Sequence, residues 1–317
     1  MPTLNMDYNM NMDYNMNMAS SGASVGGNGT RARFNSEDYR RYVAMAGGNI
    51  NEAVVPNNPE NLAFPAYWDA ELRAYEYLDE FLRAYPNWRQ QLTNDIANGV
   101  AGAPANLTPT HQLGVAMGTN IPVRDEIIFV LDQAPDRQDR FQEILSQHSG
   151  EGAISYFLGM LMIDPSRMPA MNLLIRVARR IGEHIVMVLK GQFRCPRPSQ
   201  LCAAVVPMID PPATPAYPSG HSLQSQLIAR AIAGTKLSIV PPHLIFDLAD
   251  RIGQNRIIAG LHYQNDHIAG VAVANWCYVQ LLTPLAAVVN PQPSLLRRLM
   301  LAVNLEIANM PNPQPAP

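Results

Sequence analysis

The chain has 317 residues, of which 47% are hydrophobic and only 15% are charged, and its net charge is −3. This apolar fraction suffices for a sizeable core in one large domain or two small ones. The slightly acidic balance gives no reason to expect a nucleic-acid partner, so any phosphate binding must be local to one site.

The first 34 residues have low sequence complexity. They contain the unit NMDYNM twice, followed by a Ser/Gly-rich tract, and they lack the basic start and apolar run of a signal peptide. We expect a disordered tail over residues 1–34, a folded domain over 35–310 and a Pro-rich tail over 311–317. With no signal peptide visible, the protein is expected to be cytoplasmic or otherwise soluble.

Helical periodicity dominates after residue 60, and runs of alternating β-branched residues are nearly absent. Helices are expected over residues 65–84, 123–131, 137–147, 152–162, 168–190, 219–233, 241–256, 266–282 and 293–308. The pattern predicts an all-α, single-domain helical bundle. Two long loops are expected at 99–119 and 199–218, and long ordered loops often carry function.

The longest uncharged run, residues 268–296, is nearly long enough to cross a bilayer. Asn275, Gln280 and Thr283 interrupt it with polar groups, and Pro284 is expected to break the helix. We therefore interpret the run as a buried central helix and predict no membrane span.

Some other polar residues have structural interpretations. The chain has three cysteines, Cys195, Cys202 and Cys277. They show no CxxC spacing, and only a bridge between the first two is left open, so a reducing compartment is mildly favoured. Asp247, Asp250 and Arg251 are expected to form a solvated helix face.

The segment KGQFRCPRP places Lys190 at the end of the long helix expected over 168–190 and Arg197 seven residues later. Lys190 supplies a mobile point charge, and Arg197 supplies a planar fork that grips two oxygens. Pro196 and Pro198 stiffen the backbone around that arginine. The alternative is a simple C-terminal cluster, in which Lys190 and Arg194 interact with the helix dipole.

The segment PSGH opens the helix expected over 219–233. Ser219 stands at the N-cap, and Gly220 lets a ligand approach the unpaired N–H groups of the first turn. Such a terminus binds oxyanions, and its positive end is expected to lower the pKa of His221 toward the range useful for proton transfer. The alternative is an ordinary capped helix with a surface histidine.

The segment NRIIAGLHYQNDHIAG joins two further helices. Gly260 is expected to turn the chain between Arg256 and His262. Asp266 follows four residues after His262, near enough to hold one ring nitrogen and present the other as a nucleophile or ligand. Asp266 as a plain helix cap is the alternative, and His267 is expected to face solvent.

Together the three segments supply a lysine, two arginines, a helix N-terminus and two histidines. Histidines also bind metal ions, but here they come with cations, which repel a metal ion. The set therefore suits a tetrahedral oxyanion.

The order K-x6-RP, PSGH, R-x5-H-x3-D resembles the three-part signature of the type 2 phosphatidic acid phosphatase (PAP2) and vanadium haloperoxidase superfamily. The matching residues are Lys190, Arg197, Pro198, Pro218, Ser219, Gly220, His221, Arg256, His262 and Asp266. The resemblance covers a motif core over 190–270, says little about residues 1–150, and implies a helical bundle of the PAP2 and haloperoxidase type. Asn255 stands where the family usually has a serine, which puts any role of that hydroxyl in doubt.

The resemblance implies a role for each matching residue. His262 would attack phosphorus, His221 would protonate the leaving alcohol and then activate water, and Asp266 would orient His262. The phosphoryl oxygens would be held by Lys190, Arg197, Ser219, Gly220 and Arg256. In a haloperoxidase the same residues would hold vanadate, with His262 bonded to vanadium.

The preferred hypothesis is a soluble PAP2-type acid phosphatase that hydrolyses small phosphate monoesters through a phospho-histidine and needs no cofactor. The alternative is a vanadium-dependent haloperoxidase that uses vanadate to oxidise halide with hydrogen peroxide. Haloperoxidases often place an aromatic residue or a histidine a few residues before PSGH. Here Thr214 is neither, and Tyr217 is shared by many phosphatases, so the phosphatase is favoured. A third hypothesis is an anion-binding protein without catalysis, and homo-oligomer formation stays open.

Overall fold

The computed structural model of the chain describes residues 69–110, 121–237 and 239–310. All of them belong to the compact unit Trp68–Pro317, one of two units into which the chain divides. Helices make up 69% of these residues, which contain no strand, and this confirms the predicted all-α class. The tails expected at 1–34 and 311–317 and the expected domain start at residue 35 lie outside the described residues.

The described helices follow the predicted order. The first are α3 (Ala70–Ala84), α4 (Trp88–Ala97), α5 (Ile121–Asp132), the 3₁₀ turn η2 (Ala134–Asp136), α6 (Arg137–Ser146), α7 (Gly150–Met160) and α8 (Pro169–Phe193). They continue with α9 (Pro198–Leu201), α10 (Gly220–Ala233), α11 (Pro242–Ile258), α12 (Gln264–Trp276), the π-helical segment η3 (Cys277–Leu282), α13 (Thr283–Ala287) and α14 (Leu295–Ala308). Helix α4 was not predicted, because its polar sequence buries only Trp88 and Leu92 and shows no apolar stripe.

The helix that begins with α12 runs on past Pro284, and the predicted break there is wrong. The π-helical segment η3 precedes the proline, which then lies in the first turn of α13, where a missing N–H is tolerated. The run Gln264–Ala287 is long and apolar enough to cross a membrane, and half of its most apolar window is buried. Trp276 and Cys277 of this run lie in the main hydrophobic core, which agrees with a core helix.

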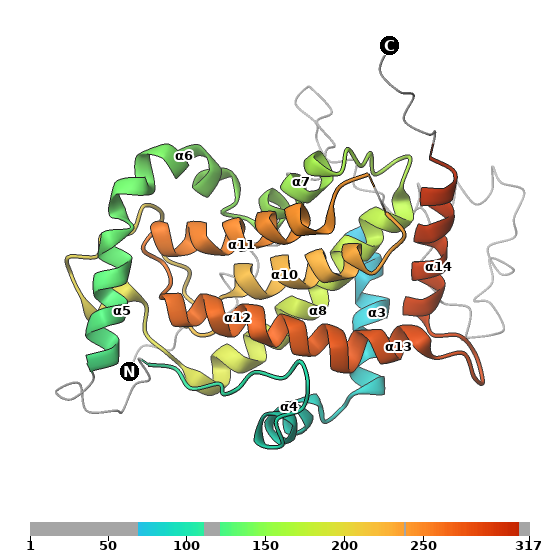
Figure 1. Ribbon diagram of the computed structural model, residues 1–317, viewed down its shortest axis with the longest axis horizontal. Helices are drawn as coiled ribbons and strands as arrows, with labels where there is room; N and C mark the ends of the chain where they lie inside the picture. The colour runs from blue at the N-terminus through green and yellow to red at the C-terminus, as the bar shows by residue number, and fades with distance from the viewer. Residues whose placement is uncertain (1–68, 111–120, 238, 311–317) are drawn as a thin grey trace, which may run out of the picture. The chain divides into compact units, whose positions relative to one another are not determined.

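Helix α10 is the centre of the described bundle. It packs against α8, α11 and α12, and Figure 1 shows it between α11 and α12. Helices α3 and α14 pack on α8, while α6 packs on α11 and α5 on α12. The apolar stripe of α8 includes Leu174, Ile181 and Ile185, all buried, and burial of each such side chain contributes about 1.5–3 kcal/mol.

This packing brings four helix ends together. The long loop after α8 leads back to the start of α10, and a short turn joins the end of α11 to the start of α12. Because α10 packs against the other three helices, the segments that hold the three sequence motifs meet at one end of the bundle.

Candidate active site

The loop before α10 holds the two cations of the first motif. The Lys190 ammonium donates hydrogen bonds to the carbonyl oxygens of Pro215 and Ala216, the latter over 2.9 Å. The Arg197 guanidinium donates from Nε and Nη2 to the carbonyl oxygen of Thr214, over 3.1 and 3.0 Å. Lys190 and Arg197 are 4% and 3% exposed, so backbone dipoles solvate both charges in place of water.

Burial makes both cations less stable in their charged forms. Burial and the neighbouring Arg197 charge lower the pKa of Lys190 to about 7, although Asp266 opposes this. Burial also lowers the pKa of Arg197 to about 10. Arg194 is exposed at the end of α8, so Lys190 does not belong to the exposed C-terminal cluster given as the alternative.

The start of α10 forms a capped helix N-terminus next to α12. The Ser219 hydroxyl accepts from the backbone N–H of Ser222 over 3.4 Å, as an N-cap does. The backbone N–H of Ser219 donates to the carbonyl oxygen of Asp266 over 2.9 Å and ties the two helix starts together. The N–H groups of Gly220 and His221 have no intrahelical acceptor and suit an anion.

His221 has one tautomer fixed by a backbone carbonyl. Its Nε2 lies 2.9 Å from the carbonyl oxygen of Gln147, which only accepts, so Nε2 carries a hydrogen and Nδ1 of the neutral ring has the free lone pair. Part of the residue reaches solvent, yet its packed surroundings and the Arg256 charge lower its pKa well below the ordinary value. A lowered pKa of His221 was expected from the positive helix end, but burial is the larger cause of the shift.

His262 is oriented by Asp266, as the four-residue spacing predicts. Its Nδ1 lies 2.8 Å from the Asp266 carboxylate, which also accepts the Tyr263 N–H over 3.1 Å and so caps α12 as well. Nε2 faces Nη1 of Arg197 over 2.9 Å and presents its lone pair there. Burial, with the Arg197 charge, lowers the pKa of His262 to about 3, so the ring is neutral at pH 7.

Arg256 is fully buried and only partly bonded. Its Nη2 donates to the carbonyl oxygen of Ile144 over 2.9 Å, while Nε and Nη1 have no hydrogen-bond partner among the described residues. Burial lowers its pKa to about 10, although Glu143 opposes this. Gly260 turns the chain between Arg256 and His262 with a φ of 77°, in the left-handed region that favours glycine.

The site as a whole has an excess of buried positive charge. Lys190, Arg197 and Arg256 are buried, and Asp266 is the only buried carboxylate among the described residues. The charges act on one another, since Lys190 and Arg197 both influence His262, and His262 influences His221. Buried cations without counter-charge are costly, and an anion of matching charge removes that cost.

Sequence reasoning missed the contribution of α6. The carbonyl oxygens of Ile144 and Gln147, at the end of this helix, hold Arg256 and His221. Gln147 is itself fully buried, and its side-chain oxygen accepts from Nδ2 of Asn255 over 2.8 Å. Any residue can accept through its backbone carbonyl, so the sequence does not show which carbonyls bond the site. The polar side chains of Gln147 and Asn255, both buried, were the one feature that could have indicated this contact.

One structural interpretation from the sequence is wrong. His267 is not solvent-facing but 5% exposed, because α12 packs this side against α10 and α11. Asp250 lies on an exposed helix face, as expected, and its carboxylate also lies 3.0 Å from Nε2 of His267. The three cysteines are free, so the bridge left open between Cys195 and Cys202 is not formed.

The chain matches no protein-family model and no curated protein. Within the described parts of the chain, no group of three or more His, Cys, Asp or Glu side chains is arranged to hold a metal ion.

Proposed function

We propose that this protein is a PAP2-type phosphatase that hydrolyses small phosphate monoesters through a phospho-histidine. The observation that carries the proposal is the cluster of three buried cations with one buried carboxylate, beside a histidine whose Nε2 lone pair is held ready by Asp266. A phosphoryl group has the charge that this cluster lacks, and phosphoryl transfer is catalysed mainly by positioning and charge stabilisation.

Substrate binding draws on the donors of the three buried cations, of which Lys190 and Arg197 bond backbone carbonyls in the described structure. Lys190, Arg197 and the free Nε and Nη1 of Arg256 hold the phosphoryl oxygens, together with the N–H groups at the start of α10. The dianion offsets the Arg256 charge and so raises the pKa of His221, which burial and Arg256 hold low in the free protein. Binding thereby prepares His221 to carry a proton.

The chemistry proceeds in two displacements. In the first, Nε2 of His262 forms a bond to phosphorus, the ester P–O bond breaks, and His221 gives its proton to the leaving oxygen. In the second, a water molecule loses a proton to His221 and attacks phosphorus, and the N–P bond breaks to release phosphate and free His262. Asp266 accepts the Nδ1 hydrogen bond throughout and stabilises the positive charge that develops on the ring.

The chemistry of Thr214 supports a phosphatase over a haloperoxidase. Its carbonyl and hydroxyl oxygens both accept from Arg197, the hydroxyl over 3.2 Å, so this position holds a cation and offers no aromatic or imidazole group to a halide. The donors that hold phosphate also fit vanadate, which resembles the phosphoryl transition state in shape and charge. Vanadate is therefore expected to inhibit hydrolysis.

The proposal is tested with p-nitrophenyl phosphate and the variant His262→Ala. We expect the variant to keep the wild-type circular dichroism spectrum and to lose at least about 10⁴-fold in kcat, because the nucleophile is absent. His243→Ala, at an exposed histidine of α11, is the control and should keep wild-type activity. Mass spectrometry of protein quenched in alkali should find the phosphoryl group on His262.

Three results would contradict the proposal. Wild-type turnover by His262→Ala would remove the nucleophile from the mechanism. Peroxide-dependent bromide oxidation by the vanadate-loaded protein, without phosphatase activity in its absence, would favour the haloperoxidase. A protein that binds phosphate but is inert in both assays would be an anion-binding protein.

A further inference from the structure

A chain of four hydrogen-bonded side chains crosses three helices and ends at the anion site. Asp250 of α11 lies 3.0 Å from Nε2 of His267 of α12, whose Nδ1 lies 2.9 Å from Oγ of Ser222. Ser222 in turn lies 2.9 Å from Oγ of Ser219, the N-cap of α10. The Asp250 side chain is 51% exposed and the other three residues are buried, so the chain leads from the surface to the site.

A glycine on α11 makes room for the middle of this chain. A Cβ atom at Gly253 would lie 2.5 Å from Nδ1 of His267 and 2.7 Å from Oγ of Ser222, closer than atoms pack. The close approach of α11 to this contact therefore requires glycine at this position. The contact between His267 and Ser222 is built into the packing of three helices.

From His267 the hydrogen bonds run in two directions, one toward Asp250 and the other through Ser222 toward Ser219. The hydrogen bond from His267 lowers the pKa of Asp250, so this carboxylate is ionised and accepts from Nε2. Ser222 donates its hydroxyl hydrogen to Ser219, and Nδ1 of His267 must then carry a hydrogen to bond Ser222.

The consequence falls on the Ser219 hydroxyl. Its oxygen accepts twice from Ser222, once from the backbone N–H and once from the hydroxyl. A hydroxyl has two lone pairs and one hydrogen, so its hydrogen is the one group left to form a bond. It cannot be directed back at Ser222 while Ser222 donates to it.

We propose that His267, held by Asp250, is a positioning residue that acts through Ser222 to fix the Ser219 hydroxyl as a hydrogen-bond donor to the bound phosphoryl group. The inference rests on the proposed function, because that function brings a phosphoryl group to Ser219. His267 itself does not touch the substrate.

A double-mutant cycle tests whether His267 acts through Ser219. Calorimetric titration with inorganic phosphate measures affinity without turnover for the wild type, His267→Leu, Ser219→Ala and the double variant. We expect His267→Leu to weaken phosphate binding about tenfold in the wild-type background and to have no further effect once Ser219 is alanine. His267→Asn, whose amide still donates to Ser222, should restore most of the loss.

The exposed end of the chain gives a second test that does not disturb the core. Asp250→Asn removes the carboxylate that holds Nε2 of His267 and should weaken phosphate binding about threefold, again only when Ser219 is present. Asp247→Asn is the matched control, because Asp247 is an exposed carboxylate on the same helix, and should bind phosphate as the wild type does. These two variants test the inference even if His267→Leu does not fold.

The outcomes separate the two proposals. If the wild type does not bind phosphate, the proposed function is wrong and this inference is wrong with it. If the wild type binds phosphate but His267→Leu weakens binding equally with and without Ser219, this inference is overturned and the proposed function is not. The inference would also be overturned if Asp250→Asn bound phosphate with wild-type affinity, or if His267→Asn bound it no more tightly than His267→Leu.

Discussion

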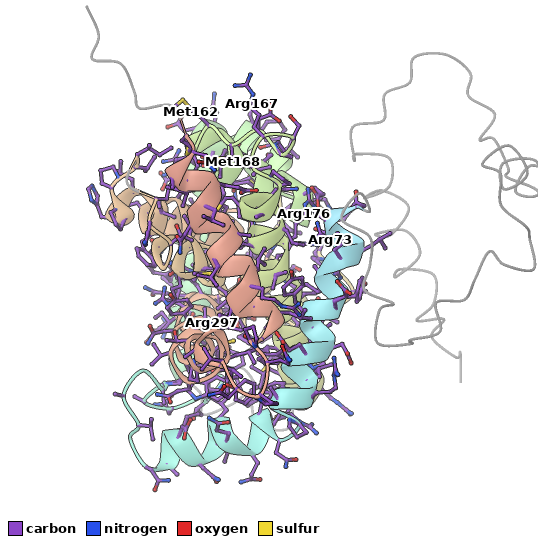
Figure 2. The ribbon with its side chains drawn as sticks, turned by 90° about the vertical axis from the view of Figure 1, so that its right-hand side faces the viewer. Arg73, Met162, Arg167, Met168, Arg176 and Arg297 are labelled. Atoms are coloured by element: carbon purple, nitrogen blue, oxygen red, sulfur yellow. The ribbon has the colours of Figure 1, made fainter. Side chains whose placement is uncertain are left out.

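Helix α8 carries two groups of buried charge that differ in their partners. Around its middle, the arginine–glutamate cluster joins α8 to α3 and α7, and Figure 2 shows Arg176 beside α3. Its members are Glu71, Glu151, Arg176, Arg179, Arg180 and Glu183. Near the end of α8, Lys190 belongs to the cation cluster with Arg197 and Arg256, whose hydrogen bonds go mainly to backbone carbonyls.

The pKa values respond in opposite directions in the two clusters. Burial lowers the pKa of Arg176 and Arg180, but the glutamates outweigh burial and raise it overall. In the cation cluster burial prevails, and the pKa of Arg197 and Arg256 falls to about 10. The first cluster is complete within the protein, whereas the second has two more buried cations than buried carboxylates. We therefore interpret the charge-balanced arginine–glutamate cluster as structural, and the cation cluster, with its excess positive charge, as a binding site for an anion.

The largest difference between the two clusters is expected from the variant Arg256→Met, which should lose activity without losing stability. Loss of a guanidinium from the anion site should lower kcat/KM for p-nitrophenyl phosphate by at least about 100-fold. The melting temperature should stay the same or rise, because replacing an uncompensated buried ion with an apolar side chain is often neutral or stabilising.

Arg251→Met, at a half-exposed arginine on the same helix, is the matched control and should change little in either measurement. A large loss of thermal stability in Arg256→Met would show that this cation serves the fold and would break the comparison.

Glu71→Gln should act on stability alone. Glu71 bonds Arg176, Arg179 and Arg180, so its loss leaves three partly buried cations short of a partner and should lower the free energy of unfolding by about 2 kcal/mol. Burial raises the pKa of Glu71, but the three arginines together lower it by more, so its pKa lies below the ordinary value. Its contribution is therefore present at neutral pH and lost as the pH falls through its folded-state pKa.

Urea unfolding at neutral and acidic pH measures this effect, and the difference between wild type and Glu71→Gln should shrink in acid. Asp79→Asn, in an exposed pair with Arg83, is the control and should change stability little. Phosphate affinity should not change in Glu71→Gln, and a clear loss of affinity would mean that the two clusters are not independent.

The smallest expected effect is a pH dependence of anion affinity set by Lys190. Sulfate is a suitable probe because it stays a dianion over the range of interest. Burial, the largest cause, and the Arg197 charge lower the pKa of Lys190 to about 7, and a bound dianion raises it again. Affinity should therefore fall by up to about tenfold per pH unit above about pH 7. Lys190→Arg should flatten this fall, and an unchanged slope in that variant would assign the titration to another group.

Much of the bundle could be predicted because its helices are long and periodic. The stripe of α8 follows directly from the positions of its apolar residues, and the capped start of α10 follows from Ser219. Local rules failed at α4, which is held by two buried residues, and at Pro284, where a π-helical segment carries the helix onward. Both cases depend on packing against distant residues, which periodicity does not report.

The candidate site was predictable where its contacts are local. The four-residue spacing of His262 and Asp266 gave the hydrogen bond between them. The carbonyl acceptors of Thr214, Pro215 and Gln147 were not predictable, because every residue has a backbone carbonyl. The burial of His267 was missed for a related reason, since its partners lie on two other helices.

The contacts of α6 set a lower limit on any fragment that retains this chemistry. The three motifs lie between residues 190 and 270, yet Arg256 and His221 are anchored by carbonyls at the end of Arg137–Ser146 and just after it. A segment cut to the motifs alone would release one cation and one imidazole from their anchors. Grafting the site onto another helical scaffold would likewise require a helix end presented from outside the motif region.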